Sequence, residues 1–170
     1  MLAVLLLSAT QPLLLSITVS TGTLLLSQAS AHAQSAEAVS KVAQAITVRI
    51  EGATQGSGVL VKRDGRRYTV LTAWHVVSGN KHGEEVDIYT PDGRRYAAIK
   101  DSIKRLSNVD LATLEFSGEK SYGIARIGAV EDVKRGDRLL VAGFPVQQSL
   151  GISLSGGRLM ASASYRANDG

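Results

Sequence analysis

The sequence contains no cysteine and few aromatic residues, and each shortage limits what the protein can be. Without cysteine the chain forms no disulfides, builds no metal–thiolate site and offers no thiol nucleophile. Aromatic residues make up only 5% of the chain, so a core must be built mainly from Val, Ile, Leu and Ala. The fold is therefore expected to hold together by packing alone, without covalent cross-links.

The excess of positive charge is small and dispersed. The net charge is +4, and basic residues occur in pairs beside turn signals: Lys62-Arg63, Arg66-Arg67 and Arg94-Arg95. Such pairs are typical of solvated loops, so we do not expect nucleic acid as a partner. His75 and His82 have no metal-ligand spacing, and we expect neither a metal nor another cofactor. At 170 residues, with 44% hydrophobic and 20% charged residues, the chain fits one soluble globular domain.

Charge of either sign is absent from the first 33 residues. Leucine-rich stretches there lead to the small-x-small triplet Ala31-His32-Ala33, the type of site that signal peptidase cuts. We expect residues 1–33 to be a signal peptide cleaved after Ala33, and the protein to be exported by a bacterium to the periplasm or the medium. An uncleaved membrane anchor is the alternative, but polar residues interrupt the apolar run. No other membrane association is expected.

The pattern after the export segment predicts a short helix and then many strands. Residues 34–44 are a helical lead-in, with Ser35 as a possible N-cap. Ile46, Val48 and Ile50 then alternate with polar residues, as in a half-buried strand. Gly52–Gly58 is expected to turn, and hairpins are expected at Asp64-Gly65 and Pro91-Asp92-Gly93. Further short strands are expected around residues 59–61, 68–72, 86–89, 96–99, 111–116, 123–127, 138–142 and 152–163. This spacing predicts an all-β barrel or sandwich.

One histidine stands out from the three in the chain. His32 lies in the export segment, and His82 lies in a polar turn. His75 ends a predicted strand among apolar neighbours, where composition alone favours a structural role. Asp110, between apolar residues in Asn108–Ala112 at the start of a predicted strand, is expected to be a buried carboxylate that needs a hydrogen-bond donor. A carboxylate that orients an imidazole leaves the second ring nitrogen free as a general base.

Three segments resemble the trypsin-like serine peptidases, especially their exported bacterial branch. They are GSGVLV…YTVLTAWHVV, NVDLATLEF and GDRLLVAGFP, and they occur in the family's order between Ile46 and Arg158. The resemblance implies hydrolysis of protein or peptide substrates, with His75 as the catalytic base and Asp110 as its orienting acid. It also implies a fold of two antiparallel β-barrels with the site between them.

The catalytic serine motif of that family, Gly-x-Ser-Gly-Gly-Pro, does not occur in these 170 residues. Ser155-Gly156-Gly157 has no proline after it, comes too soon after Asp110 and is expected to lie in a strand. Ser57 is expected to belong to a tight strand crossing. We therefore expect a peptidase domain at 45–170 that is incomplete at its C-terminus. Its first barrel (about 45–116) is complete, its second barrel is truncated, and the chain alone is inactive.

Two other interpretations remain open at this point. The chain can be a non-catalytic trypsin-like module that binds peptides or cell-wall components. It can also be an unrelated β-barrel interaction domain, in which case His75 and Asp110 lie far apart. Nothing in the pattern selects an oligomeric state.

Overall fold

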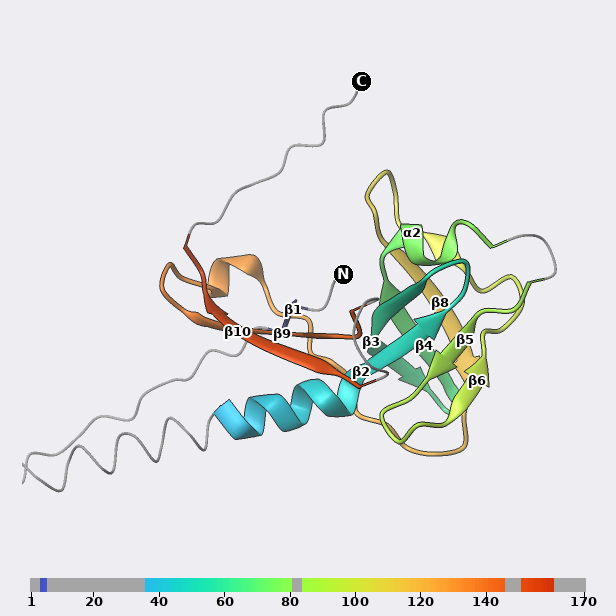
Figure 1. Cartoon of the computed structure of the whole chain (residues 1–170), viewed down its shortest axis with the longest axis horizontal. Helices are drawn as coiled ribbons and strands as arrows, with labels where there is room; N and C mark the ends of the chain where they lie inside the picture. Colours follow the sequence, from blue (N-terminus) through green and yellow to red (C-terminus); the bar gives the residue numbers. More distant parts are fainter. Residues whose placement is uncertain (1–3, 6–35, 81–83, 146–150, 161–170) are drawn as a thin grey trace, which may run out of the picture.

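The fold consists of two β-sheets and one longer helix, as seen in a computed structural model that describes residues 4–5, 36–80, 84–145 and 151–160 (Figure 1). The larger sheet contains β2 (Thr47–Glu51), β3 (Gln55–Asp64), β4 (Arg67–Thr72), β5 (Asp87–Tyr89), β6 (Arg95–Ala97), β7 (Lys104–Arg105) and β8 (Ala112–Ser117). The smaller sheet contains β1 (Val4–Leu5), β9 (Arg138–Gly143) and β10 (Ser153–Arg158). Short helical turns are α2 (Trp74–Val77) and η1 (Val130–Asp132). The predicted all-β class is confirmed.

The larger sheet curls into the first barrel. Its strand order is β6-β5-β2-β3-β4-β8-β7, and every neighbouring pair is antiparallel. The amide of Ile99, just after β6, donates to the carbonyl of Glu115 on β8 at 2.7 Å. Ser102 Oγ accepts the amide of Glu115 at 3.0 Å beside it. These bonds bring the two ends of the sheet together, in agreement with the barrel expected from residues 45 to 116.

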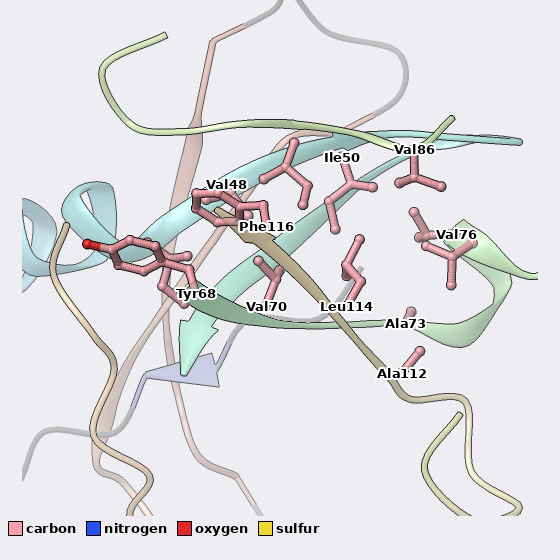
Figure 2. Close-up of a cluster of buried hydrophobic side chains, with 13 residues drawn as sticks. Val48, Ile50, Tyr68, Val70, Ala73, Val76, Val86, Ala112, Leu114 and Phe116 are labelled. Carbon is pink, nitrogen blue, oxygen red and sulfur yellow. The ribbon is translucent and has the colours of Figure 1, made fainter. Parts of the chain in front are cut away.

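The barrel core is formed by side chains from alternate strand positions, as Figure 2 shows. Tyr68 stacks on Phe116 with ring centroids 5.1 Å apart. The predicted inward positions of β2, Val48 and Ile50, are fully buried. The other buried members are Leu60, Val70, Ala73, Val76, Val77, Val86, Ile88, Ala112 and Leu114.

The prediction that β2 is only half buried is wrong. Thr47 and Arg49, on its other face, are 2% and 7% exposed. β2 lies between β3 and β5 within the larger sheet, and β9 of the smaller sheet also contacts it. Arg49 forms an ion pair with Glu51, and its guanidinium lies 3.9 Å from the ring centroid of Tyr89. The buried charge is therefore paired and stacked rather than solvated.

Both predicted hairpins are confirmed. β3 and β4 pair up to Asp64 and Arg67, which leaves Gly65 and Arg66 as the turn. Gly65 has φ of 58°, and Gly93, in the turn between β5 and β6, has φ of 78°. These backbone conformations favour glycine because it has no Cβ to clash.

The predicted turn over Gly52–Gly58 is shorter in the structure, because β3 begins at Gln55. Gly56 and Gly58 are strand residues that admit close neighbours. A Cβ on Gly56 would lie 2.4 Å from a methyl of Val76, and one on Gly58 would lie 2.4 Å from a methyl of Val70. The glycine-rich sequence predicts a turn here, whereas in the structure these two glycines allow close packing of side chains against a strand.

The connector between the two sheets is fixed to the first barrel, but it is not the strand predicted over 123–127. Tyr68 OH donates to the carbonyl of Lys120 at 2.8 Å and accepts the amide of Tyr122 at 3.2 Å. The amide of Ala125 donates to the carbonyl of Leu60 at 2.8 Å. β3 has a bulge directly after Leu60, and a bulge frees backbone groups from the ladder. The connector therefore forms isolated hydrogen bonds to the barrel instead of the continuous ladder of a paired strand.

The predicted lead-in helix is present over residues 36–46 and ends two residues later than expected. Ala43 and Ile46 are its buried residues, and Thr47 Oγ1 donates to the carbonyl of Ala43 at 2.6 Å. The proposed N-cap, Ser35, lies outside the described residues. No helix among the described residues has the length and apolar character needed to cross a membrane.

The smaller sheet, in the order β1-β9-β10, begins the second barrel. β9 and β10 pair from Arg138 opposite Arg158 to Gly143 opposite Ser153. Val4 and Leu5, from the expected export segment, pair with Val141 and Leu140 on the other edge of β9. In Figure 1 this sheet lies beside the ends of β2 and β3.

Candidate active site

His75 lies on α2, immediately after the strand that was expected to carry it. β4 ends at Thr72, and the chain turns into α2 at Trp74. Val76 and Val77 are buried in the barrel core, whereas the His75 side chain is 59% exposed. The bare backbone of Gly56 lets Val76 approach β3 closely. Two buried valines therefore hold a short helix whose opposite face presents the imidazole.

Asp110 lies in the loop between β7 and β8. The amide of Leu106 donates to the carbonyl of Leu111 at 2.9 Å and closes this loop. Ser107 has φ of 52°, which fits the sharp reversal. The prediction of a buried carboxylate at a strand start is wrong, because the Asp110 side chain is 58% exposed. The loop closes outside the end of the barrel, where water still reaches the carboxylate.

The structure brings these two predicted residues together. His75 Nδ1 lies 2.7 Å from Asp110 Oδ2, and the His75 backbone amide donates to Asp110 Oδ1 at 2.9 Å. Both carboxylate oxygens thus contact one residue. Hydrogen bonds from the His75 ring and then from its amide hold the pKa of Asp110 below its ordinary value. An ionised Asp110 accepts a hydrogen bond from Nδ1–H, so the neutral imidazole has its lone pair at Nε2.

A cation–aromatic contact joins the elements that carry the pair. The Arg105 guanidinium lies 5.6 Å from the Trp74 ring centroid, which connects β7 to α2. Arg105 Nε also donates to the carbonyl of Val109 at 3.4 Å, next to Asp110. Sequence reasoning missed Arg105, since one basic residue before a loop has no distinctive pattern.

The two serines considered from the sequence, Ser57 and Ser155, lie in different sheets. Ser57 is a buried residue of β3, and its carbonyl accepts Thr72 Oγ1 at 2.8 Å. Ser155 lies in β10 opposite Val141, and it is exposed. Its place in a strand agrees with the sequence prediction. His32 and His82 lie outside the described residues.

A metal centre finds no candidate within the described part of the chain, where no three His, Asp or Glu side chains come together in a way that could hold an ion. Nε2 of an oriented neutral imidazole can accept a proton from a hydroxyl, and the resulting imidazolium is stabilised by the carboxylate at Nδ1.

The curled antiparallel barrel with a His–Asp pair at one end, followed by the start of a second sheet, defines the class of β-barrel serine peptidases. The chain belongs to the trypsin-like peptidase domain family, whose family model matches residues 56–169. The matched range contains both His75 and Asp110. A peptidase domain of this kind implies a protein or peptide substrate. The curated proteins contain no significant match to this chain.

The unrelated interaction barrel is excluded by this family match. It also required His75 and Asp110 to lie far apart, whereas their side chains are within hydrogen-bonding distance.

Proposed function

We propose that the chain is the His- and Asp-bearing part of an exported serine endopeptidase. The observation that carries the proposal is the contact of Asp110 with both His75 Nδ1 and the His75 amide. This pair of bonds fixes the tautomer and the ring orientation of a general base. Membership of the trypsin-like peptidase family supplies the reaction class.

In the proposed reaction His75 Nε2 takes the proton of a serine hydroxyl as its oxygen attacks the scissile carbonyl carbon. The imidazolium then gives that proton to the leaving amine as the carbon–nitrogen bond breaks, leaving an acyl-enzyme. A water molecule then attacks the acyl carbon while the same Nε2 takes its proton. The imidazolium returns that proton to the serine oxygen as the ester bond breaks, which releases the acid and restores the serine. Asp110 stays ionised throughout and stabilises the imidazolium.

The serine and the oxyanion hole must come from outside these 170 residues, because no Gly-x-Ser-Gly-Gly-Pro occurs in them. A His–Asp pair alone forms no acyl-enzyme. We therefore expect the purified chain to leave casein and fluorogenic peptides intact and to resist labelling by a fluorophosphonate. His75→Ala should behave identically. Casein cleavage that disappears in His75→Ala would contradict the proposed absence of the nucleophile.

The coding DNA beyond the Gly170 codon separates this proposal from its alternative. A reading frame that continues into Gly-x-Ser-Gly-Gly-Pro supports the endopeptidase. In that longer protein Asp110→Asn should lower kcat by about 10⁴-fold, because the imidazole then adopts the wrong tautomer. A stop codon directly after Gly170 instead favours a non-catalytic module that binds peptides or cell-wall components. Such binding should survive both His75→Ala and Asp110→Ala.

Export rests on the uncharged segment 1–33 and the triplet Ala31-His32-Ala33. We expect protein recovered from the periplasm or the medium to begin at Gln34. Edman sequencing or the intact mass tests this directly. Retention of Met1 in a membrane fraction would favour the uncleaved anchor, and a cytoplasmic location would contradict export.

A further inference from the structure

The two sheets are joined by a hydrogen bond at Ser57. Ser57 Oγ on β3 accepts a hydrogen bond from the backbone amide of Phe144, the residue directly after β9, at 2.7 Å. The two residues are 87 positions apart, and Ser57 is only 4% exposed. β9 also lies against β2 and β3. The bond therefore forms at a packed junction between the sheets and not at a solvated loop.

The same residue also contacts the strand that leads to His75. The Ser57 carbonyl accepts Thr72 Oγ1 at 2.8 Å, and Thr72 is the last residue of β4 and fully buried. Gly56, the preceding residue, packs against Val76 of α2. Gly56 and Ser57 of β3 thus contact three places: Phe144 after β9, the end of β4, and the helix that carries the imidazole.

We propose that Ser57 is a positioning residue that fixes the second sheet relative to His75. This extends the proposed function, which requires the half of the site built on the second sheet to meet the imidazole correctly. The hydroxyl is suited to the role because it satisfies a Phe144 amide that is shielded at the junction. Without the hydroxyl, the Phe144 amide loses its hydrogen-bond partner in the protein. Displacement of Phe144 toward water is then favoured.

The test uses the full chain and NMR, so it requires no catalysis. In Ser57→Ala we expect the Phe144 amide to exchange with solvent at least tenfold faster. Residual dipolar couplings from β3 and β9 should then no longer fit one alignment tensor. Ser57→Thr keeps the hydroxyl and should restore both properties. Ser155→Ala removes an exposed serine from β10 and should change neither.

Wild-type exchange at Phe144 together with a single alignment tensor in Ser57→Ala would overturn the proposal. Failure of Ser57→Thr to restore them, with the barrel intact, would count against the hydroxyl as the cause. If Ser57→Ala disturbs the barrel itself, Ser57→Cys decides the matter. Its weaker acceptor should give intermediate exchange at Phe144, and wild-type exchange there would overturn the assignment.

A kinetic measurement connects the bond to catalysis in the longer protein that contains the serine motif. Misplacement of about 1 Å typically costs about 10²-fold in rate, so kcat should fall by about that factor in Ser57→Ala. KM should change little, and Ser57→Thr should recover the loss. An unchanged kcat in Ser57→Ala overturns the positioning role. Absence of hydrolysis in every form, wild type included, defeats the proposed function, and the NMR experiment then decides the role of Ser57 by itself.

Discussion

Asp110 is the residue whose protonation state most directly reports the His–Asp contact. Its pKa is depressed because the His75 ring and amide hydrogen bond to the ionised carboxylate. A depressed pKa in the folded state means that ionisation stabilises the fold above the ordinary value of 3.8, and that this contribution is lost as the pH falls through the folded pKa. Because the side chain is largely exposed, the interaction is screened by water and salt.

Removing the imidazole should therefore raise the pKa of Asp110 toward its ordinary value. The measurement is a pH titration of the Asp110 Cγ chemical shift in wild type and in His75→Ala. Asp92 is the matched control, because its carboxylate accepts bonds from Thr90, Lys120 and Tyr122 rather than from His75. An Asp110 titration that does not move in His75→Ala would show that the pair does not form in solution.

Asp92 is the second residue with a strong pH dependence. Burial opposes its ionisation, but hydrogen bonds from Thr90, Lys120, Tyr122 and the Arg94 backbone outweigh burial and hold its pKa far below 3.8. Its contribution to stability is present above that ordinary value and declines as the pH falls below it. Burial of Tyr122, opposed by a bond from Thr90, raises the pKa of its phenol above the ordinary 10.0.

Asp92→Asn should lower the free energy of unfolding at pH 7 by about 1–3 kcal/mol, because charge-assisted bonds become neutral ones. Urea unfolding across pH 3 to 7 measures the difference between variant and wild type. We expect the difference to shrink at the acid end, because below about pH 3.8 Asp92 of the unfolded wild type takes up a proton while the folded carboxylate stays ionised. A difference that grows toward acid would contradict the sign of the depressed pKa.

At the scale of elements, the position of α2 depends on the missing side chain of Gly56. A methyl group there would lie 2.4 Å from Val76 Cγ2 and 2.7 Å from Val76 Cγ1. Because Val76 anchors α2 in the core, Gly56→Ala should displace the helix that carries His75. We expect a loss of about 1–3 kcal/mol in the free energy of unfolding, as for other overpacked cores.

Gly157→Ala, in β10, is the matched control because nothing lies within 4 Å of the added Cβ. Chemical unfolding measures the stabilities, and the His75 ring resonances report movement of α2. Gly56→Ala combined with Val76→Ala should recover part of the shift in those resonances. If Gly56→Ala is as stable as Gly157→Ala, the close contact between Gly56 and Val76 does not contribute to the free energy of unfolding.

The strands were predictable where hydrophobic alternation and turn residues agreed. Val48 and Ile50 point into the core, and Gly65 and Gly93 make the expected turns. The site was predictable to the level of which residues meet, because Thr-Ala-x-His and Asp-Leu-Ala have a recognisable context. Exposure of Asp110 was not predictable, since it depends on how a loop closes over the end of the barrel. The burial of Arg49 was not predictable either, because it depends on tertiary contacts such as the stacking of its guanidinium on Tyr89 of β5.

At the scale of the whole molecule, the apolar core is concentrated in the first barrel. All 13 residues of the main buried cluster lie between Val48 and Phe116. By contrast, Ile127, Val130 and Met160, in and around the second sheet, are 80%, 66% and 71% exposed. The two sheets should therefore differ in local stability, since buried apolar contacts set the cost of opening.

Native-state hydrogen exchange of the whole chain tests this difference. Amides of β2, β4 and β8 should exchange only by global unfolding, and their rates should track denaturant with the full m-value. Amides of β9 and β10 should exchange by a smaller opening with a weaker denaturant dependence. Uniform protection across both sheets would mean that the molecule unfolds as one cooperative unit.

The anchored connector has a mechanical consequence for the molecule. Because Tyr68 and Leu60 hold the chain up to Ala125, the pivot for any rotation of the second sheet lies between residues 126 and 137. The Ser57–Phe144 bond provides a second attachment at the opposite end of β9. With both attachments in place the second sheet is held at two points and cannot rotate about the pivot. If the Ser57–Phe144 bond is lost, the sheet is free to rotate about the pivot alone. Under a pulling force applied beyond β10, we expect rupture at Phe144 to come first and the barrel to stay intact.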